Sequence, residues 1–255
     1  MDRPAAADCR RLDSFARSAG NARVAARSAK DYGELLRSGR WFAGLPDALQ
    51  AALIGGAVVR RVRPRGRLFS RGDEADGLYA VLDGGIRVSG ASESGREALL
   101  TLLEPPSWFG EISIFDGQPR THDAVAGGEA LVLHVPRRAL DAILDGEPRY
   151  WRELGLLVTS KLRLAFTAME DMALLPIAVR LARRLAMMAE GYGEREHQRR
   201  TVEVSQEQLA QMLSTSRQTA NQLLKELAAR GLIRLSYGTI EILDLDGLRR
   251  AAGVA

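Results

Sequence analysis

Residues 109–126 contain the polar groups needed to bind a sugar phosphate. Arg120 offers a planar fork of donors that suits a phosphate, and Thr121 adds a hydroxyl. Glu111 can accept hydrogen bonds from ribose hydroxyls, and Gly110 lets the backbone approach a ligand closely. A short helical turn after Glu111 would present free N–H groups to an anion. The ligand-binding residues predicted from this run are Gly110, Glu111, Ile112, Ser113, Arg120 and Thr121.

Residues 204–227 have the spacing of a unit that contacts DNA. Ser205 and Gln208 form a capping box that starts one helix, and Ser216 can cap the next. Apolar residues at helical spacing face inward, which leaves a polar row outside. The pattern predicts a helix-turn-helix with its recognition helix at 217–230, followed by a two-stranded wing. The predicted DNA-binding residues are Ser205, Ser216, Arg217, Gln218, Thr219, Asn221, Gln222 and Lys225.

A third pattern lies between Pro148 and Pro176, where no other proline interrupts a helical period. Apolar side chains recur four, three, four and three residues apart, which is a short heptad-like seam for a second copy of the chain. Leu157 and Leu164 form a second flank that would face the strands. A seam this short could also pack on those strands alone. The predicted dimerisation residues are Val158, Leu162, Ala165, Met169 and Met172.

The elements that position these residues follow from the remaining pattern. Short alternating segments separated by glycine turns, among them 78–82, 99–103, 112–115 and 131–135, predict an all-β roll, sandwich or barrel. The expected α+β chain has a flexible N-terminal arm at 1–40, a β-roll (jelly roll) at 41–150, a long dimerisation helix with a hinge at 151–175 and a winged helix-turn-helix at 176–255.

Composition excludes several classes of protein. The 255 residues carry a formal charge of +4, and the last 80 have 12 basic and nine acidic groups, which suits nucleic acid. A single cysteine, Cys9, excludes an internal disulfide, and three histidines are too few for a transition-metal centre. No apolar run is long enough to span a membrane, and the start lacks a secretory signal, so a cytoplasmic location is expected. No nucleophile–base set or P-loop occurs, so we expect no enzymatic activity.

Residues 109–126 resemble the phosphate-binding cassette of cyclic-nucleotide-binding domains, and residues 66–84 resemble the roll signature of the same family. With a long helix and a winged helix-turn-helix following in order, residues 41–250 resemble the Crp/Fnr superfamily of bacterial transcription regulators. The resemblance implies a DNA-binding homodimer on a palindromic site, with double-stranded DNA and RNA polymerase as partners and no metal. It leaves the effector open among a cyclic nucleotide such as cAMP or cGMP, another small molecule, or none.

The sequence departs from the family at three places. Cyclic-AMP-binding members place an adjacent Thr-Ser on the dimer helix against the adenine, and Ala165 and Phe166 stand there instead. We expect Phe166 to lie beside the ligand, filling space or stacking on a base. Readers of a TGTGA half-site begin the recognition helix with Arg-Glu, where this chain has Arg217-Gln218. Redox-sensing members use several cysteines to hold an iron–sulfur cluster, which Cys9 alone cannot do.

A second function remains open, that of a nucleotide-sensing signalling module that acts through protein partners. The polar row on the second helix argues against it, because a protein-docking helix should expose apolar anchors. The sequence does not reveal whether the protein activates or represses, which operator it binds, or what residues 1–40 do.

Overall fold

The computed structural model describes residues 28–91, 97–193 and 200–253. Its helices are η1 Ala29–Tyr32, α1 Gly33–Arg37, α2 Arg40–Ala43, α3 Asp47–Gly55, α4 Ile112–Asp116, α5 Arg137–Gly146, α6 Tyr150–Leu174, α7 Ile177–Ala189, η2 Gly191–Gly193, α8 Gln206–Met212, α9 Arg217–Ala229 and α10 Leu245–Ala251. Its strands are β1 Val58–Val62, β2 Arg67–Phe69, β3 Gly77–Asp83, β4 Ile86–Ala91, β5 Glu97–Leu103, β6 Trp108–Phe109, β7 Asp123–Ala126, β8 Ala130–Pro136, β9 Thr201–Val202, β10 Ile233–Ser236 and β11 Thr239–Ile242.

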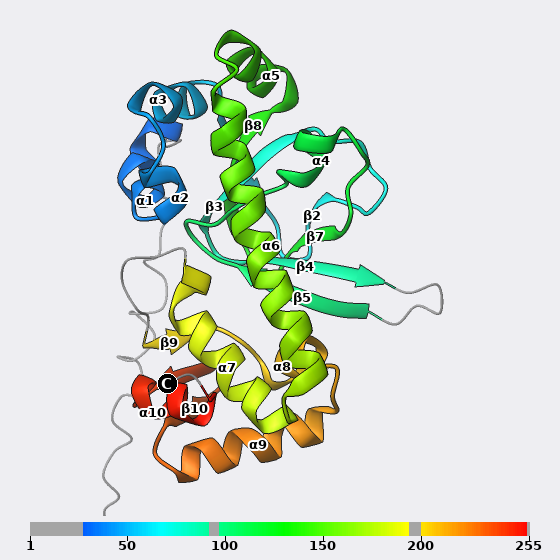
Figure 1. The fold of residues 1–255 in the computed structure, drawn as a ribbon, viewed down its shortest axis with the longest axis vertical. Helices are drawn as coiled ribbons and strands as arrows, with labels where there is room; N and C mark the ends of the chain where they lie inside the picture. Colours follow the sequence, from blue (N-terminus) through cyan, green and yellow to red (C-terminus); the bar gives the residue numbers. More distant parts are fainter. Residues whose placement is uncertain (1–27, 92–96, 194–199, 254–255) are drawn as a thin grey trace, which may run out of the picture.

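Two antiparallel four-stranded sheets form the predicted roll (Figure 1). One has the strand order β1-β8-β3-β6 and the other β2-β7-β4-β5. Inward-facing side chains such as Tyr79, Ile86, Phe109 and Val132 are at most 3% exposed and form the core between the sheets. The segment 112–115, grouped with the strands from its apolar pattern, is the helix α4, as the alternative of a helical turn after Glu111 predicted.

The N-terminal segment corrects the expected arm. Residues 28–40 are not a loose extension, because η1, α1 and the start of α2 pack on the roll. Leu36 and Phe42 are fully buried, and Phe42 stacks on Trp108 with ring centroids 5.3 Å apart. Burial of these apolar side chains holds the segment on the roll. The Arg and Ser residues around them made this apolar pattern hard to recognise in the sequence. The rest of the predicted arm, residues 1–27, lies outside the described part.

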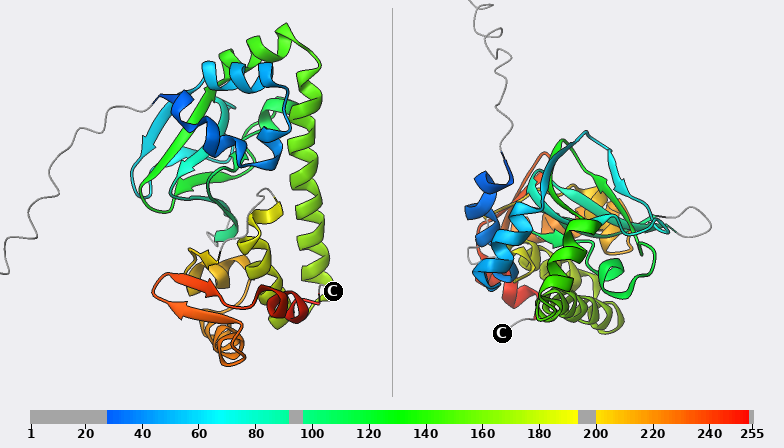
Figure 2. Two further views of the ribbon diagram at one scale, coloured as in Figure 1. Left: turned by 90° about the vertical axis from the view of Figure 1, so that its left-hand side faces the viewer. Right: turned by 90° about the horizontal axis from the view of Figure 1, so that it is seen from above.

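The long helix α6 runs from α5 past the roll to the C-terminal module (Figure 1). Figure 2 shows the roll and the module on the same side of α6. Leu157 of the predicted second flank is buried against the roll together with Leu154, while Leu164 of that flank is half-buried. Helix α6 ends before Pro176, whose ring suits the start of the next helix, α7. No helix in the described ranges is both long and apolar enough to cross a membrane.

The C-terminal module is the predicted winged helix-turn-helix. Helices α8 and α9 pack on α7, and the wing strands β10 and β11 form an antiparallel sheet with β9. Gly231, at a φ of +72°, ends α9 in the left-handed conformation that glycine tolerates. Leu99 and Leu102 of β5 are buried in the same apolar cluster as α7 and α8, so the roll packs directly against the module.

Candidate nucleic-acid interface and ligand pocket

Helix α9 is held by its caps and by one apolar face. Ser216 Oγ accepts a hydrogen bond from the Thr219 backbone N–H at 3.0 Å, which satisfies a free donor of the first turn. Ala220 and Leu224 are fully buried against the module core. Because these residues fix how the helix is rotated, the opposite face is presented outward at the end of the molecule remote from the roll (Figure 1).

The outward face carries the predicted polar row. Arg217, Gln218, Thr219, Gln222 and Lys225 are exposed, and Asn221 is half-buried. Gln222 donates to Glu226 at 3.1 Å, whereas the side chains of Arg217, Gln218 and Lys225 have no hydrogen bond or ion pair to any described residue. Ser205, also predicted to bind DNA, is half-buried and caps α8 through its bond from Gln208 N. Arg217, Gln218 and Lys225 are therefore free to contact another molecule, whereas Gln222 already has a partner on its own helix.

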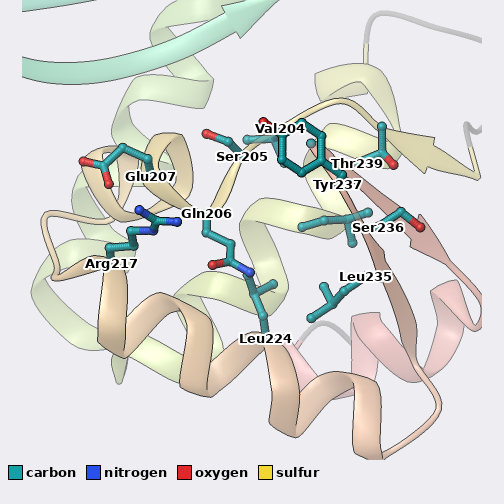
Figure 3. A pocket seen from close by; sticks show the side chains of 12 residues that line it. Val204, Ser205, Gln206, Glu207, Arg217, Leu224, Leu235, Ser236, Tyr237 and Thr239 are labelled. Carbon is teal, nitrogen blue, oxygen red and sulfur yellow. The ribbon is translucent and has the colours of Figure 1, made fainter.

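A hollow of about 400 Å³ lies between the start of α8, the first turn of α9 and the wing. Figure 3 shows Arg217 pointing toward Gln206 on one side of this hollow, with Tyr237 and Thr239 of the wing on the other. Tyr237 is fully exposed at the wing turn. Sequence reasoning omitted Tyr237, although an aromatic residue beside Gly238 in a hairpin turn was the signal available.

In the cassette, Glu111 is buried and paired. Its side chain is 3% exposed, and Lys161 of α6 donates to Glu111 Oε2 at 2.8 Å and to the Trp108 carbonyl at 2.6 Å. Lys161 was not among the predicted site residues. It follows Leu157 by four residues, so it lies on the flank that faces the roll. The carboxylate predicted to meet a ribose therefore already has a cation from the long helix.

Arg120 is likewise buried, at 3% exposure, and its fork is already bonded to the protein. It donates to the carbonyls of Gly110 and Gly77, each at 2.7 Å, and to Asp76 Oδ1 at 2.8 Å. Its guanidinium lies 4.2 Å from the Phe69 ring centroid. Gly110 has a φ of +91°, and a side chain there would come within 2.8 Å of Arg120. Both terminal nitrogens of Arg120 are thus bonded to the protein, while its buried Nε has no partner among the described residues, so a phosphate would compete with Asp76 and the two carbonyls only for the terminal nitrogens.

The other cassette residues occupy varied environments. Ser113 is buried and donates to the Pro119 carbonyl at 3.3 Å, while Ile112 on the same helix is 40% exposed. Thr121 is exposed, and its hydroxyl lies 2.9 Å from Nδ1 of His122. The structure thus brings Gly110, Glu111 and Arg120 together and leaves Thr121 at the rim.

Asp76 links Arg120 to two ring side chains, Tyr79 and His134. Burial raises the pKa of Asp76, but hydrogen bonds from Tyr79 and Arg120 outweigh that effect and hold it below its ordinary value. Burial also raises the pKa of the Tyr79 hydroxyl, helped by its bond to Asp76. His134 stacks on Tyr79 at 4.4 Å between centroids, and burial lowers its pKa below the ordinary 6.5. The described residues include no group of three His, Cys, Asp or Glu side chains placed to hold a metal ion.

The predicted seam on α6 is exposed within one chain. Leu162 is 49% exposed, Met169 64% and Met172 60%, with Ala165 exposed and Val158 half-buried. Phe166 is 56% exposed, so it fills no space within its own chain. It follows Lys161 by five residues, which turns it about 140° away from the side of α6 that faces the cassette. Ala165, Met169 and Met172 also line the cavity between the roll and the C-terminal module, whereas Leu162 is not among the residues that line it.

Comparisons with known proteins agree with these two sites. The model of the cyclic nucleotide-binding domain matches residues 59–147, and that of the Crp-like helix-turn-helix domain matches residues 179–251. The chain is 33% identical to the "CRP-like cAMP-activated global transcriptional regulator" of Mycobacterium tuberculosis, over 74% of this chain and 86% of that protein. It is 30% identical to the "Cyclic AMP receptor protein" of Thermus thermophilus, over 76% of this chain and 88% of that protein.

Solved structures show the same fold. FixK2 from Bradyrhizobium japonicum superposes with a TM-score of 0.70 at 19% identity, covering 78% of this chain and 98% of that one. A CRP-family transcriptional regulator from Thermus thermophilus superposes with a TM-score of 0.60 at 26% identity, covering 77% and 97%.

The roll, the long helix and the winged helix-turn-helix define a DNA-binding transcription regulator with a cyclic nucleotide-binding domain. More particularly, the chain belongs to the Crp/Fnr superfamily.

Proposed function

We propose that the protein acts as a homodimer that contacts a palindromic DNA site through Arg217, Gln218, Asn221 and Gln222. The observation that supports this most is the outward polar row of α9, in which Arg217 and Gln218 have no partner among the described residues. Arg217 suits the two acceptors of guanine, and amide side chains suit adenine. We propose that Lys225, Thr219 and the helix caps Ser205 and Ser216 contact phosphates. RNA polymerase is the protein partner we propose, and chromosomal DNA as target implies the cytoplasm.

The exposed seam of α6 is the proposed dimer contact. Leu162, Met169 and Met172 are 49%, 64% and 60% exposed, and the two methionines also line the cavity between the roll and the C-terminal module. Apolar side chains in such a row would be removed from water by the same row of a second chain. Leu162→Lys should produce a monomer in light scattering at micromolar concentration. Val58→Lys, at an equally exposed position on β1, should leave a dimer, and a monomeric wild type would refute the proposal.

For the roll, we propose a small anionic effector held by Gly110, Glu111, Ser113, Arg120 and Thr121, with Ile112 beside it. A cyclic nucleotide is the leading candidate, because relatives carry cyclic AMP in their names. Asp76 would compete with a phosphate for Arg120, whose buried Nε has no partner among the described residues. Phe166 would approach an effector only from the partner chain. The proposed role requires no catalysis.

Calorimetric titration of cAMP and cGMP tests the effector proposal. Asp76→Asn should bind the responding nucleotide more tightly than the wild type, because the competing charge is removed. Asp83→Asn, in the exposed hairpin after β3, is the control and should change nothing. Failure of both nucleotides to bind either protein would exclude them as effectors.

Mapping of genomic binding with a tagged protein tests the regulatory function. The wild type should occupy discrete promoter sites, and Arg217→Ala with Gln222→Ala should abolish them while the protein remains dimeric. Association with protein complexes but with no genomic site would favour the alternative of a signalling module.

A further inference from the structure

A second cavity, separate from the cassette, lies where the roll meets the DNA-binding module. Its volume is about 470 Å³, within the range of small-molecule sites. Leu100 of β5, Leu164 and Ala168 of α6, Met187 of α7 and Met212 of α8 are among its lining residues. The cavity is thus enclosed by elements of both domains and by the helix that joins them.

The walls are mostly apolar and adaptable. Four of the six methionines in the chain line the cavity, namely Met169, Met172, Met187 and Met212. Methionine side chains are flexible and polarisable, so they fit apolar ligands of varied shape. This lining does not suit a nucleotide, whose sugar and phosphates require many polar partners.

Basic side chains outnumber acidic ones among the residues that line this cavity. Arg180 and Arg184 lie one turn apart on α7, so their side chains share one face. The Arg180 guanidinium has no hydrogen bond or ion pair to any described residue, and its buried Nε has no partner. Arg184 reaches only the Leu100 carbonyl, at 3.5 Å. The one acidic lining residue, Asp171, is already paired with Arg183, and Lys161 is paired with Glu111. Positive charge is therefore left without a counterion in the described structure.

Tyr192, which follows α7 and lines the cavity, has an unusual backbone conformation and a hydroxyl without a partner among the described residues. It adopts a left-handed conformation, with a φ of +55°, and its buried hydroxyl has no partner among the described residues. Non-glycine residues in this conformation are strained and occur often in binding sites. A buried polar group without a partner costs free energy that a ligand can recover.

We propose that this cavity binds an amphipathic anion, with a carboxylate at Arg180 and Arg184 and an apolar tail among the methionines. Such a ligand would contact the roll through β5 and the module through α7 and α8 at once. It would therefore act on the arrangement of the two domains without occupying the cassette. The roll and the module already meet here through Leu99 and Leu102, and Arg87 donates to Gln211 across the same boundary at 3.4 Å.

Calorimetry of the full chain with decanoate, and with decyltrimethylammonium as the probe of opposite charge, tests the proposal. Decanoate should bind once per chain and the cation should not. Arg180→Gln should weaken decanoate binding by about 10- to 100-fold, the usual effect of losing a charged hydrogen bond. Ala168→Phe should block binding by filling the cavity. Arg138→Gln on α5 and Asp83→Asn at the exposed end of β3 do not line the cavity and should leave it unchanged.

Three results would overturn the proposal: no decanoate binding at millimolar concentration, equal binding of both probes, or binding that Arg180→Gln and Ala168→Phe leave unaltered. Because Arg180 and Ala168 lie outside both the cassette and α9, failure here leaves the proposed effector and DNA sites untouched.

Discussion

The cassette and the recognition helix both present an arginine suited to an anion, but they hold it in opposite ways. Arg120 is buried and bonded to two carbonyls and to Asp76, whereas Arg217 is exposed and has no partner among the described residues. Glu111 is similarly paired with Lys161, so the two cations Arg120 and Lys161 are matched by the two carboxylates Asp76 and Glu111. The proposed DNA contact through Arg217 therefore uses a group without a partner among the described residues, whereas the proposed effector would compete with Asp76 and two carbonyls for the terminal nitrogens of Arg120.

The largest effect should come from replacing Arg120. Arg120→Met would leave two buried carbonyls and Asp76 without their donor, at a cost of about 3 kcal/mol in the free energy of unfolding. Chemical denaturation measures this loss, with Arg138→Met on the surface of α5 as the control. A change below about 0.5 kcal/mol would show that the buried bonds of Arg120 do not stabilise the roll.

The same substitution at Arg217 should behave in the opposite way. Arg217→Met should leave the free energy of unfolding within about 0.5 kcal/mol, as for an exposed residue without partners. Its affinity for the preferred DNA site should fall by about 1–3 kcal/mol, the usual contribution of a bidentate contact to guanine. Fluorescence anisotropy with specific and scrambled DNA measures this change. A loss of stability comparable to that of Arg120→Met would remove the contrast between the two regions.

The Lys161–Glu111 pair should show a smaller but clear coupling. A double-mutant cycle with Lys161→Met and Glu111→Gln should give about 1–2 kcal/mol, because the carboxylate is buried. The exposed pair Arg61–Glu129 is the matched control and should give less than about 1 kcal/mol. Equal coupling energies for the two pairs would mean that the burial of Glu111 does not strengthen its interaction with Lys161.

The smallest effect concerns pH. Burial lowers the pKa of both His134 and His122 below 6.5. As the pH falls below that value, these side chains therefore bind protons more readily in the unfolded chain than in the folded chain. Their contribution to stability is complete above pH 6.5 and is lost as the pH falls below that value. Thermal unfolding between pH 7.5 and 5.5 should show a falling Tm, and His134→Gln should reduce the slope. An unchanged slope in that variant would exclude His134 as a source.

The sequence predicted the elements whose spacing is regular. The capping box at Ser205, the helix 177–189 and the wing all appear where the pattern placed them. Helices α5 and α10 and the two-residue strand β6 were missed, because they are short and are stabilised by tertiary contacts. Within residues 28–43 the polar composition concealed that Leu36 and Phe42 are core residues.

The sequence indicated which residues form the candidate sites, but not which partners those residues already have in the fold. The motif located Glu111 and Arg120, yet only the fold shows that Lys161 and Asp76 already bind them. Asp76 is 44 residues from Arg120, and no local spacing rule connects such distant positions. Lys161 was accessible to reasoning, since a lone lysine on the Leu157 and Leu164 flank needs an acceptor in the roll. The cavity between the domains follows from how two domains pack, which helical or strand periodicity does not encode.

Selection of binding sites from random DNA by the purified wild-type protein tests the central claim most directly. We predict a palindrome with one guanine in each half-site, contacted by Arg217, that differs from TGTGA at the positions contacted by Gln218 and Gln222. Gln218 cannot act as the pure acceptor that a carboxylate provides for cytosine. Recovery of an unchanged TGTGA palindrome would show that Gln218 and Gln222 do not read bases, and the absence of any enriched sequence would contradict the proposed DNA site as a whole.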